Sequence, residues 1–279
     1  MKTRLNAMQI VVVIIATAGG MLIIPSDQSH AAVVCPTTST ADADGDGLTD
    51  QQECAGITLL DNVTQVATCA LNVTPDQRVN CLDPNSKDLF FILAKATNSL
   101  IDVYLPNLDP LGILRKTLSQ QGLGITVHAI TDVQAPNRQI TATQMAIRMA
   151  ENLDTSDVTT GSCSQGTPNG PDRCAVFTQR IVNLITSTCA GKACILSPGG
   201  TSTIAGVIAV FIQNTISHEA SHSLSLTSKY DSRFGGNHYK TGTNTVMDQS
   251  VYYVSKTSDV TFYLPGVYAS IDPSTFLLR

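Results

Sequence analysis

The chain carries little charge and has no long basic run. Only 14% of its 279 residues are charged, and the formal net charge is -5. Proteins that bind nucleic acid concentrate Lys and Arg against the phosphates, so nucleic acid is excluded as an expected partner. The 43% of hydrophobic residues predicts one good-sized core with a small appendage.

A hydrophobic run long enough to span a bilayer is also missing. The apolar stretch at 10–24 falls short of the ~20 residues that a membrane-spanning helix needs. Lys2 and Arg4 precede it and small residues follow it, which is typical of a secretory signal peptide. We expect residues 1–31 to be removed and the rest to be secreted without a membrane anchor; the alternative is an uncleaved anchor.

The eight cysteines include no Cys-x-x-Cys pair, which argues against zinc held by thiolates. All eight follow the predicted cleavage point, and an oxidising compartment favours four disulfides. A thiolate zinc site is the alternative. Their spacing as successive near neighbours favours the pairs Cys35–Cys54, Cys69–Cys81, Cys163–Cys174 and Cys189–Cys194.

The sequence changes character near Ser86, from a polar, cysteine-containing stretch to alternating apolar runs. We therefore expect a small module over 32–86 and a main domain over 87–279. Short apolar, β-branched runs predict strands at 88–94 and 124–131. Apolar spacing and end signals predict helices at 109–122, 141–153 and 204–226, and residues 175–188 suggest a strand followed by a helix.

The twelve residues "DADGDGLTDQQE" have the spacing of an EF-hand calcium loop, with Gly47 at its sharp turn. The alternative is a solvated acidic linker. The loop resembles those of thrombospondin type 3 and dockerin-like secreted modules, which implies structural calcium. The predicted ligands are Asp42, Asp44, Asp46, the Leu48 carbonyl, Asp50 and Glu53.

Histidine and glutamate are scarce, with five and three copies, yet "HEASH" places three of them together. On a helix, His218 and His222 lie on one face and can reach one metal ion, while Glu219 can approach its water. The motif is H-E-x-x-H, and the neutral residues around it are typical of the zincin metallopeptidases, which this segment resembles.

The resemblance to the metzincin branch of that superfamily is partial. That pattern would continue with glycine at 225 and histidine at 228, but both positions are serine. His238, after a double glycine, is the expected third zinc ligand, with Asp231 as the alternative. Met247 in "TVMDQS" resembles the methionine turn beneath the metal.

The resemblance implies an α+β fold with a mixed sheet over the active-site helix. It also implies a secreted zinc-dependent endopeptidase that acts on protein or peptide substrates, with Glu219 as general base. Candidate hydrogen-bond donors to the oxyanion are Tyr239, Tyr252 and Tyr253. The alternative is a calcium-dependent surface or adhesion protein with a structural zinc site, which would need four protein ligands.

Overall fold

A computed structural model describes residue 35 and residues 40–70, 75–119, 124–141, 144–156, 159–164, 173–197, 203–224 and 253–263. The predicted signal peptide at 1–31 lies outside these residues. None of the described helices is long and apolar enough to cross a membrane. The described elements are a mixture of helices and strands, as the expected α+β class requires.

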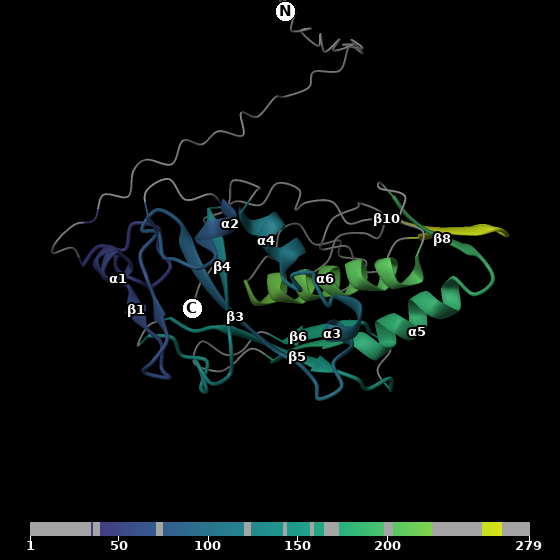
Figure 1. The fold of residues 1–279 in the computed structure, drawn as a ribbon, viewed down its shortest axis with the longest axis horizontal. Helices are drawn as coiled ribbons and strands as arrows, with labels where there is room; N and C mark the ends of the chain where they lie inside the picture. Colours follow the sequence, from purple (N-terminus) through teal and green to yellow (C-terminus); the bar gives the residue numbers. More distant parts are fainter. Residues whose placement is uncertain are drawn as a thin grey trace, which may run out of the picture. The chain divides into compact units, whose positions relative to one another are not determined.

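A five-stranded sheet organises the larger part of the described chain (Figure 1). Its strand order is β4-β3-β5-β7-β6. The first four strands in that order are parallel to one another, and the edge strand β6 runs antiparallel to β7. The strands are β3 (Lys87–Ala94), β4 (Ile125–Ile130), β5 (Ile147–Asn152), β6 (Gly161–Ser164) and β7 (Arg173–Phe177).

Strand β3 is apolar from Leu89 to Ala94 because both faces of the sheet are covered. Leu89 and Phe91 belong to the hydrophobic cluster on the helical side, whereas Phe90 and Ile92 belong to a second cluster on the opposite side. A strand buried on both faces reads as a continuous apolar run instead of an alternating one. The predicted strands at 88–94 and 124–131 are confirmed as β3 and β4.

Helices cover one face of the sheet. The longest, α6 (Ile204–Ser223), packs on β5, β6 and β7 and also contacts the three shorter helices on this face. Figure 1 shows α6 running alongside β5 and β6. The helix predicted at 109–122 is confirmed over a shorter range, and the strand followed by a helix at 175–188 is confirmed as β7 and α5. These helices are α3 (Leu100–Tyr104), α4 (Gly112–Ser119), α5 (Thr178–Thr188) and α6 (Ile204–Ser223).

Residues between Leu48 and Leu82 pack on the opposite face of the five-stranded sheet. Leu48 and Leu82, both fully buried, share one hydrophobic cluster with Phe90 and Ile92 of β3. Residues on both sides of the predicted boundary near Ser86 therefore contribute to one core, and the boundary itself stays a prediction. The elements here are α1 (Asp50–Ala55), β1 (Ile57–Thr58), β2 (Gln65–Val66) and α2 (Pro75–Arg78).

A second, three-stranded sheet joins β8 (Ala193–Ser197), β9 (Tyr253–Ser255) and β10 (Asp259–Tyr263). Strand β10 pairs in parallel with β8 and antiparallel with β9. Phe262 of β10 packs edge-on against Phe211 of α6, with ring centroids 5.3 Å apart. This contact ties the small sheet to the long helix.

All eight cysteines form disulfides, and the four predicted pairs are confirmed. They are Cys35–Cys54, Cys69–Cys81, Cys163–Cys174 and Cys189–Cys194. Thiolate zinc binding, the alternative considered for these residues, is therefore wrong for this structure. Each bridge closes a short loop, so it restricts the unfolded chain locally.

The helix predicted at 141–153 is wrong, because residues 147–152 form strand β5. Ile147, Met149 and Glu151 are buried while the residues between them are less so, which is the period of a strand. Met, Ala, Arg and Glu favour helices as isolated residues. Pairing with β3 on one side and β7 on the other overrides that preference.

Glu151 shows that one of the three glutamates has a structural role. Its Oε1 accepts hydrogen bonds from the Leu100 and Ile101 amides, at 2.9 and 3.1 Å, and from the Thr178 hydroxyl at 2.9 Å. Its Oε2 accepts one from the Ala96 amide at 3.1 Å. A buried carboxylate with four donors fixes the start of α3 against β5 and α5.

Replacing Glu151 with Gln puts an amide NH₂ where an acceptor is needed. We expect the free energy of unfolding to fall by about 1.5–3 kcal/mol, the range for hydrogen bonds to a charged group. Urea denaturation measures the change. Asp102→Asn, on the exposed side of α3, is the control. A Glu151→Gln variant as stable as the control would contradict this role.

Candidate metal centres and active site

The H-E-x-x-H motif lies in the last two turns of α6. Thr203 begins this helix by accepting a hydrogen bond from the Gly206 amide at 3.1 Å. Val207, Ile208 and Phe211 are buried, which anchors the helix on the sheet before the motif is reached. His218 and His222 then follow one turn apart on one face.

The two imidazoles converge. The Nε2 atoms of His218 and His222 are 3.2 Å apart, and the ring centroids are 4.9 Å apart with an angle of 82° between the planes. Two nitrogens bound to one tetrahedral zinc at 2.0–2.1 Å would be separated by about 3.3 Å. Both rings are only partly buried. The pair therefore fits a zinc ion that is reachable from outside.

Glu219 is buried against strand β6 of the sheet. It is 5% exposed, and burial raises the pKa of its carboxyl to about 8. A carboxyl group with a pKa near neutral can both accept and return a proton at physiological pH. Its role as general base stays a prediction.

Strand β6 passes directly over Glu219, and Gly161 makes this approach possible. A Cβ atom at position 161 would lie 2.6 Å from Oε1 of Glu219 and 2.7 Å from Cγ2 of Thr215. Real Cβ atoms essentially never lie so close to other atoms, so a residue larger than glycine at 161 would force the Glu219 or Thr215 side chain to shift. Sequence reasoning missed Gly161, since only the pairing of β6 with β7 brings it over α6.

Replacing Gly161 with Ala should displace the Glu219 carboxylate. If Glu219 is the general base, we expect kcat/KM for a peptide substrate to fall by about 10²-fold, because small misplacements of a catalytic group have effects of this size. Zinc content should not change. Ser162→Ala, at an exposed position of the same strand, is the control. Unchanged activity of Gly161→Ala would contradict the proximity argument.

A disulfide lies against the end of the motif. Cys163 of β6 pairs with Cys174 of β7, and the Ser223 hydroxyl donates toward both sulfurs at 3.1 Å. Ser223 immediately follows His222. The bridge thus holds the edge strand β6 in place beside the turn of α6 that carries the second histidine.

Most of the other predicted residues of this site lie outside the described part of the chain. These residues are Asp231, His238, Tyr239, Met247 and Tyr252. Tyr253 lies in β9, with its ring centroid 5.3 Å from that of Phe262. Its role as an oxyanion donor stays a prediction, as do the roles of the other five.

Hydrogen bonds from backbone amides of the predicted calcium loop to its own carboxylate side chains hold the loop in its fold. Asp42 accepts hydrogen bonds from the Gly45, Asp46 and Gly47 amides, at 2.7, 3.1 and 3.0 Å. Gly47 has a φ of 94°, the left-handed conformation that its place at the sharp turn requires. Asp50 closes the loop by accepting from the Ala43 amide at 2.8 Å.

Four buried carboxylate oxygens of this region have no hydrogen-bond partner among the described residues. Glu53 is fully buried, and neither of its side-chain oxygens has a hydrogen-bond partner among the described residues. The same holds for Oδ2 of Asp44 and for Oδ2 of Asp88. Carboxylates can hydrogen-bond to one another only if one is protonated, so these oxygens need either protons or a cation.

The acidic oxygens form two overlapping groups that share Asp46. One group is Asp42, Asp44 and Asp46, the other is Asp46, Glu53 and Asp88, and the oxygens within each group lie within 4.8 Å of one another. Burial, followed by the neighbouring carboxylates, raises the pKa of Asp44 to about 8 and that of Glu53 to about 10. Such a set of hard oxygen donors fits calcium.

Asp88 was not among the predicted ligands. It is the second residue of β3, 35 positions beyond Glu53, so no motif links it to the loop. A carboxylate at the start of an otherwise apolar, buried strand is the only signal that sequence reasoning had available. The other predicted ligands, Leu48 and Asp50, lie within the folded loop, and the Leu48 side chain is fully buried.

No family model matches the chain, and no curated protein matches it. Among solved structures, the chain is similar to one described as "GM1 bound form of the ECX AB5 holotoxin", with 16% identity and a TM-score of 0.29. The match covers 49% of this chain and 51% of that chain, so this chain spans about half the length of the structure it matches. This likeness carries no argument about fold or function.

Proposed function

We propose that this protein is a secreted zinc-dependent endopeptidase. The observation that carries the proposal is the convergence of the His218 and His222 Nε2 atoms to 3.2 Å on the helix that also carries the buried Glu219. A mostly parallel sheet with one antiparallel edge strand above the motif helix supports the metzincin-like resemblance. The four disulfides agree with an extracellular location.

His218 and His222 would hold the zinc ion, with His238 as the proposed third ligand and Asp231 as the alternative. Zinc supplies Lewis acidity, which lowers the pKa of bound water and polarises a carbonyl group. Glu219 accepts the proton of the attacking water and delivers it to the leaving amine. The raised pKa of Glu219 suits both steps, because the carboxyl can hold the proton between them.

The edge strand β6 supports an extended peptide as the substrate. It is the last strand in the sheet order, and its other edge pairs with no strand among the described residues. Extended peptides bind such edges through backbone hydrogen bonds, and their affinity then depends little on side chains. Gly161 places this edge next to Glu219. A protein or peptide is therefore the proposed partner.

Metal analysis together with proteolysis tests the proposal. We expect about one zinc ion per chain, casein cleavage that stops with a zinc chelator, and recovery on adding zinc. His222→Ala should lose both zinc and cleavage. A purified protein that retains no zinc, or that cleaves equally well with the chelator, would exclude the peptidase. A non-catalytic protein with a structural zinc site predicts zinc without cleavage.

The proposal includes a calcium ion in the loop at 42–53, with a structural role. The proposed ligands are the acidic residues of the loop and the Leu48 carbonyl, and the unpartnered oxygens of Glu53 give the strongest support. Extracellular calcium loops typically bind with dissociation constants of ~10⁻⁴ to 10⁻³ M. At those values calcium acts as a constant structural component outside the cell.

A further inference from the structure

We propose that Asp88 is a ligand of the calcium ion that Asp46 and Glu53 hold, so that the ion fastens the N-terminal loop to the central sheet. The inference rests on the calcium site of the proposed function and is independent of the zinc site. It extends that site beyond the twelve residues of the loop, to a strand that contributes to both hydrophobic clusters of the protein.

The short distances between the carboxylate oxygens are the first support for this site. One carboxylate oxygen from each of Asp46, Glu53 and Asp88 lies within 4.8 Å of the other two. Oxygens on opposite sides of a calcium ion, each bound at 2.3–2.6 Å, are separated by about 4.6–5.2 Å. All three residues are fully buried, so bulk solvent does not screen these carboxylates from one another.

The second support is that some of these buried carboxylate oxygens have no hydrogen-bond partner among the described residues. Oδ2 of Asp88 and both side-chain oxygens of Glu53 are buried with no hydrogen-bond partner among the described residues. Buried polar atoms in folded proteins are almost always partnered. A cation between the carboxylates of Asp46, Glu53 and Asp88 would give all of these oxygens a partner at once.

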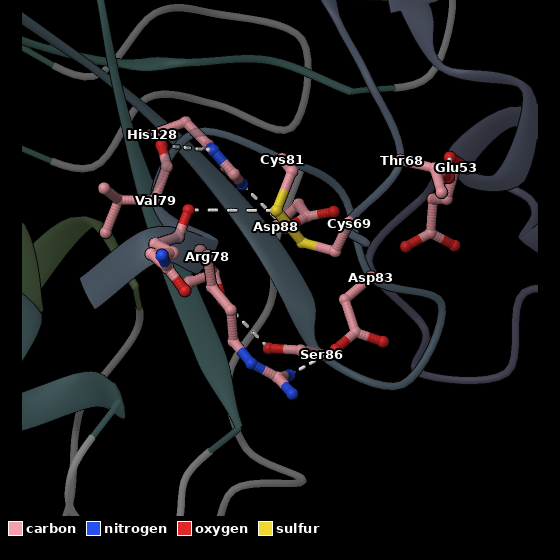
Figure 2. The surroundings of a disulfide bond; sticks show 12 residues. Glu53, Thr68, Cys69, Arg78, Val79, Cys81, Asp83, Ser86, Asp88 and His128 are labelled. Atoms are coloured by element: carbon pink, nitrogen blue, oxygen red, sulfur yellow. Dashed lines mark hydrogen bonds and ion pairs between the residues drawn. A yellow bond between two sulfur atoms is a disulfide. The ribbon is translucent and has the colours of Figure 1, made fainter. Parts of the chain in front are cut away.

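The other oxygen of Asp88 is already held in place. Figure 2 shows His128 of β4 reaching across to Asp88 on β3, and the His128 Nε2 atom lies 2.7 Å from Oδ1 of Asp88. Nδ1 of His128 lies 3.0 Å from the Val79 carbonyl oxygen, and the ring stacks on Phe90. Ligating carboxylates are commonly fixed by such outer contacts. His128 is thus a positioning residue for Asp88.

The loop also forms hydrogen bonds with residues of β3. Oδ2 of Asp46 accepts a hydrogen bond from the Asp88 amide at 2.6 Å. The Gln144 side chain donates to the carbonyls of Asp46 and Asp88, at 3.2 and 2.8 Å. Lys87 donates to the Asp44 carbonyl and, at 3.2 Å, to that of Gly45. These contacts bring the loop against the strand, and the ion completes the junction.

The test is calcium titration calorimetry on the full chain after removal of bound metal. We expect Asp88→Asn to weaken calcium binding at least about tenfold, because even outer-shell changes reduce metal affinity 10–100-fold. The matched control is Asp83→Asn: Asp83 is also buried, but its oxygens are partnered by Arg78 and Asn85. This control should lose stability and keep its calcium affinity.

A second measurement keeps the test independent of the folding of a variant. In the wild-type chain, calcium should slow amide hydrogen exchange at 86–92 as well as at 42–53. Slowing confined to the loop, or wild-type affinity in Asp88→Asn, would overturn the role of Asp88 and leave the loop site standing. A wild-type chain that binds no calcium would overturn both, while the peptidase assay would be unaffected.

Discussion

Replacing Glu219 with Gln is expected to remove peptide hydrolysis and leave zinc bound. Glutamine fills the same buried volume but cannot accept the proton of the attacking water. General-base catalysis contributes about 10²–10⁴-fold to the rate, so kcat/KM should fall by a factor in this range. Zinc content by elemental analysis and cleavage of a fluorogenic peptide measure the two effects separately.

His222→Ala is the comparison for that experiment. It should lose zinc and activity together, since it removes one of two converging imidazoles. The two variants thus separate the metal from the proton carrier. If Glu219→Gln cleaves at the wild-type rate, Glu219 is not the base, and if it loses its zinc the two roles are not separable as proposed.

Removing calcium is expected to destabilise the protein, and more strongly at pH 8 than at pH 5. In the metal-free protein the pKa of Asp44 is raised to about 8 and that of Glu53 to about 10, against about 4 in the unfolded chain. Between those values the folded state keeps protons that the unfolded state has released. The free energy of unfolding of the metal-free protein therefore falls as pH rises from about 4 to 8.

Calcium offsets this loss because it neutralises the ionised carboxylates. At about 100 times the dissociation constant, binding stabilises by about 2.7 kcal/mol, which corresponds to roughly 5–10 °C in Tm for a domain of this size. Calorimetry of chelator-treated protein with and without calcium, at pH 5 and pH 8, measures the effect. An equal calcium effect at both pH values would contradict this account of the carboxylates.

The three glutamates occupy three different buried environments. Among the described residues, Glu53 has no hydrogen-bond donor and lies near other carboxylates, Glu151 has four donors, and Glu219 is buried against strand β6. These environments match the role proposed for each: cation binding for Glu53, structural anchoring for Glu151 and proton transfer for Glu219. A chain with so few glutamates has none on the surface, which is where most proteins place them.

Local sequence signals predicted the elements that depend on neighbours in the chain. The long helix α6, strands β3 and β4 and the four disulfides follow from apolar runs, end signals and short cysteine spacings. The H-E-x-x-H motif and the calcium loop are also local, since one helical turn or twelve residues contain their geometry. These features need no tertiary information.

The features that depend on contacts between segments far apart in the sequence were not predicted. Strand β5 contains residues that favour helices, and only its position between β3 and β7 makes it a strand. Gly161 and Asp88 have unremarkable sequence neighbours, yet the fold places one over Glu219 and the other against Glu53. Such contacts depend on the strand order, which the sequence pattern did not specify.

The central claim is that His218 and His222 hold one zinc ion beside Glu219. Anomalous diffraction from crystals of the purified protein at the zinc absorption edge tests it most directly. The account predicts one peak 2.0–2.1 Å from the Nε2 atoms of both histidines. Well-ordered rings at these two positions with no zinc peak between them, in a zinc-supplemented crystal, would contradict it.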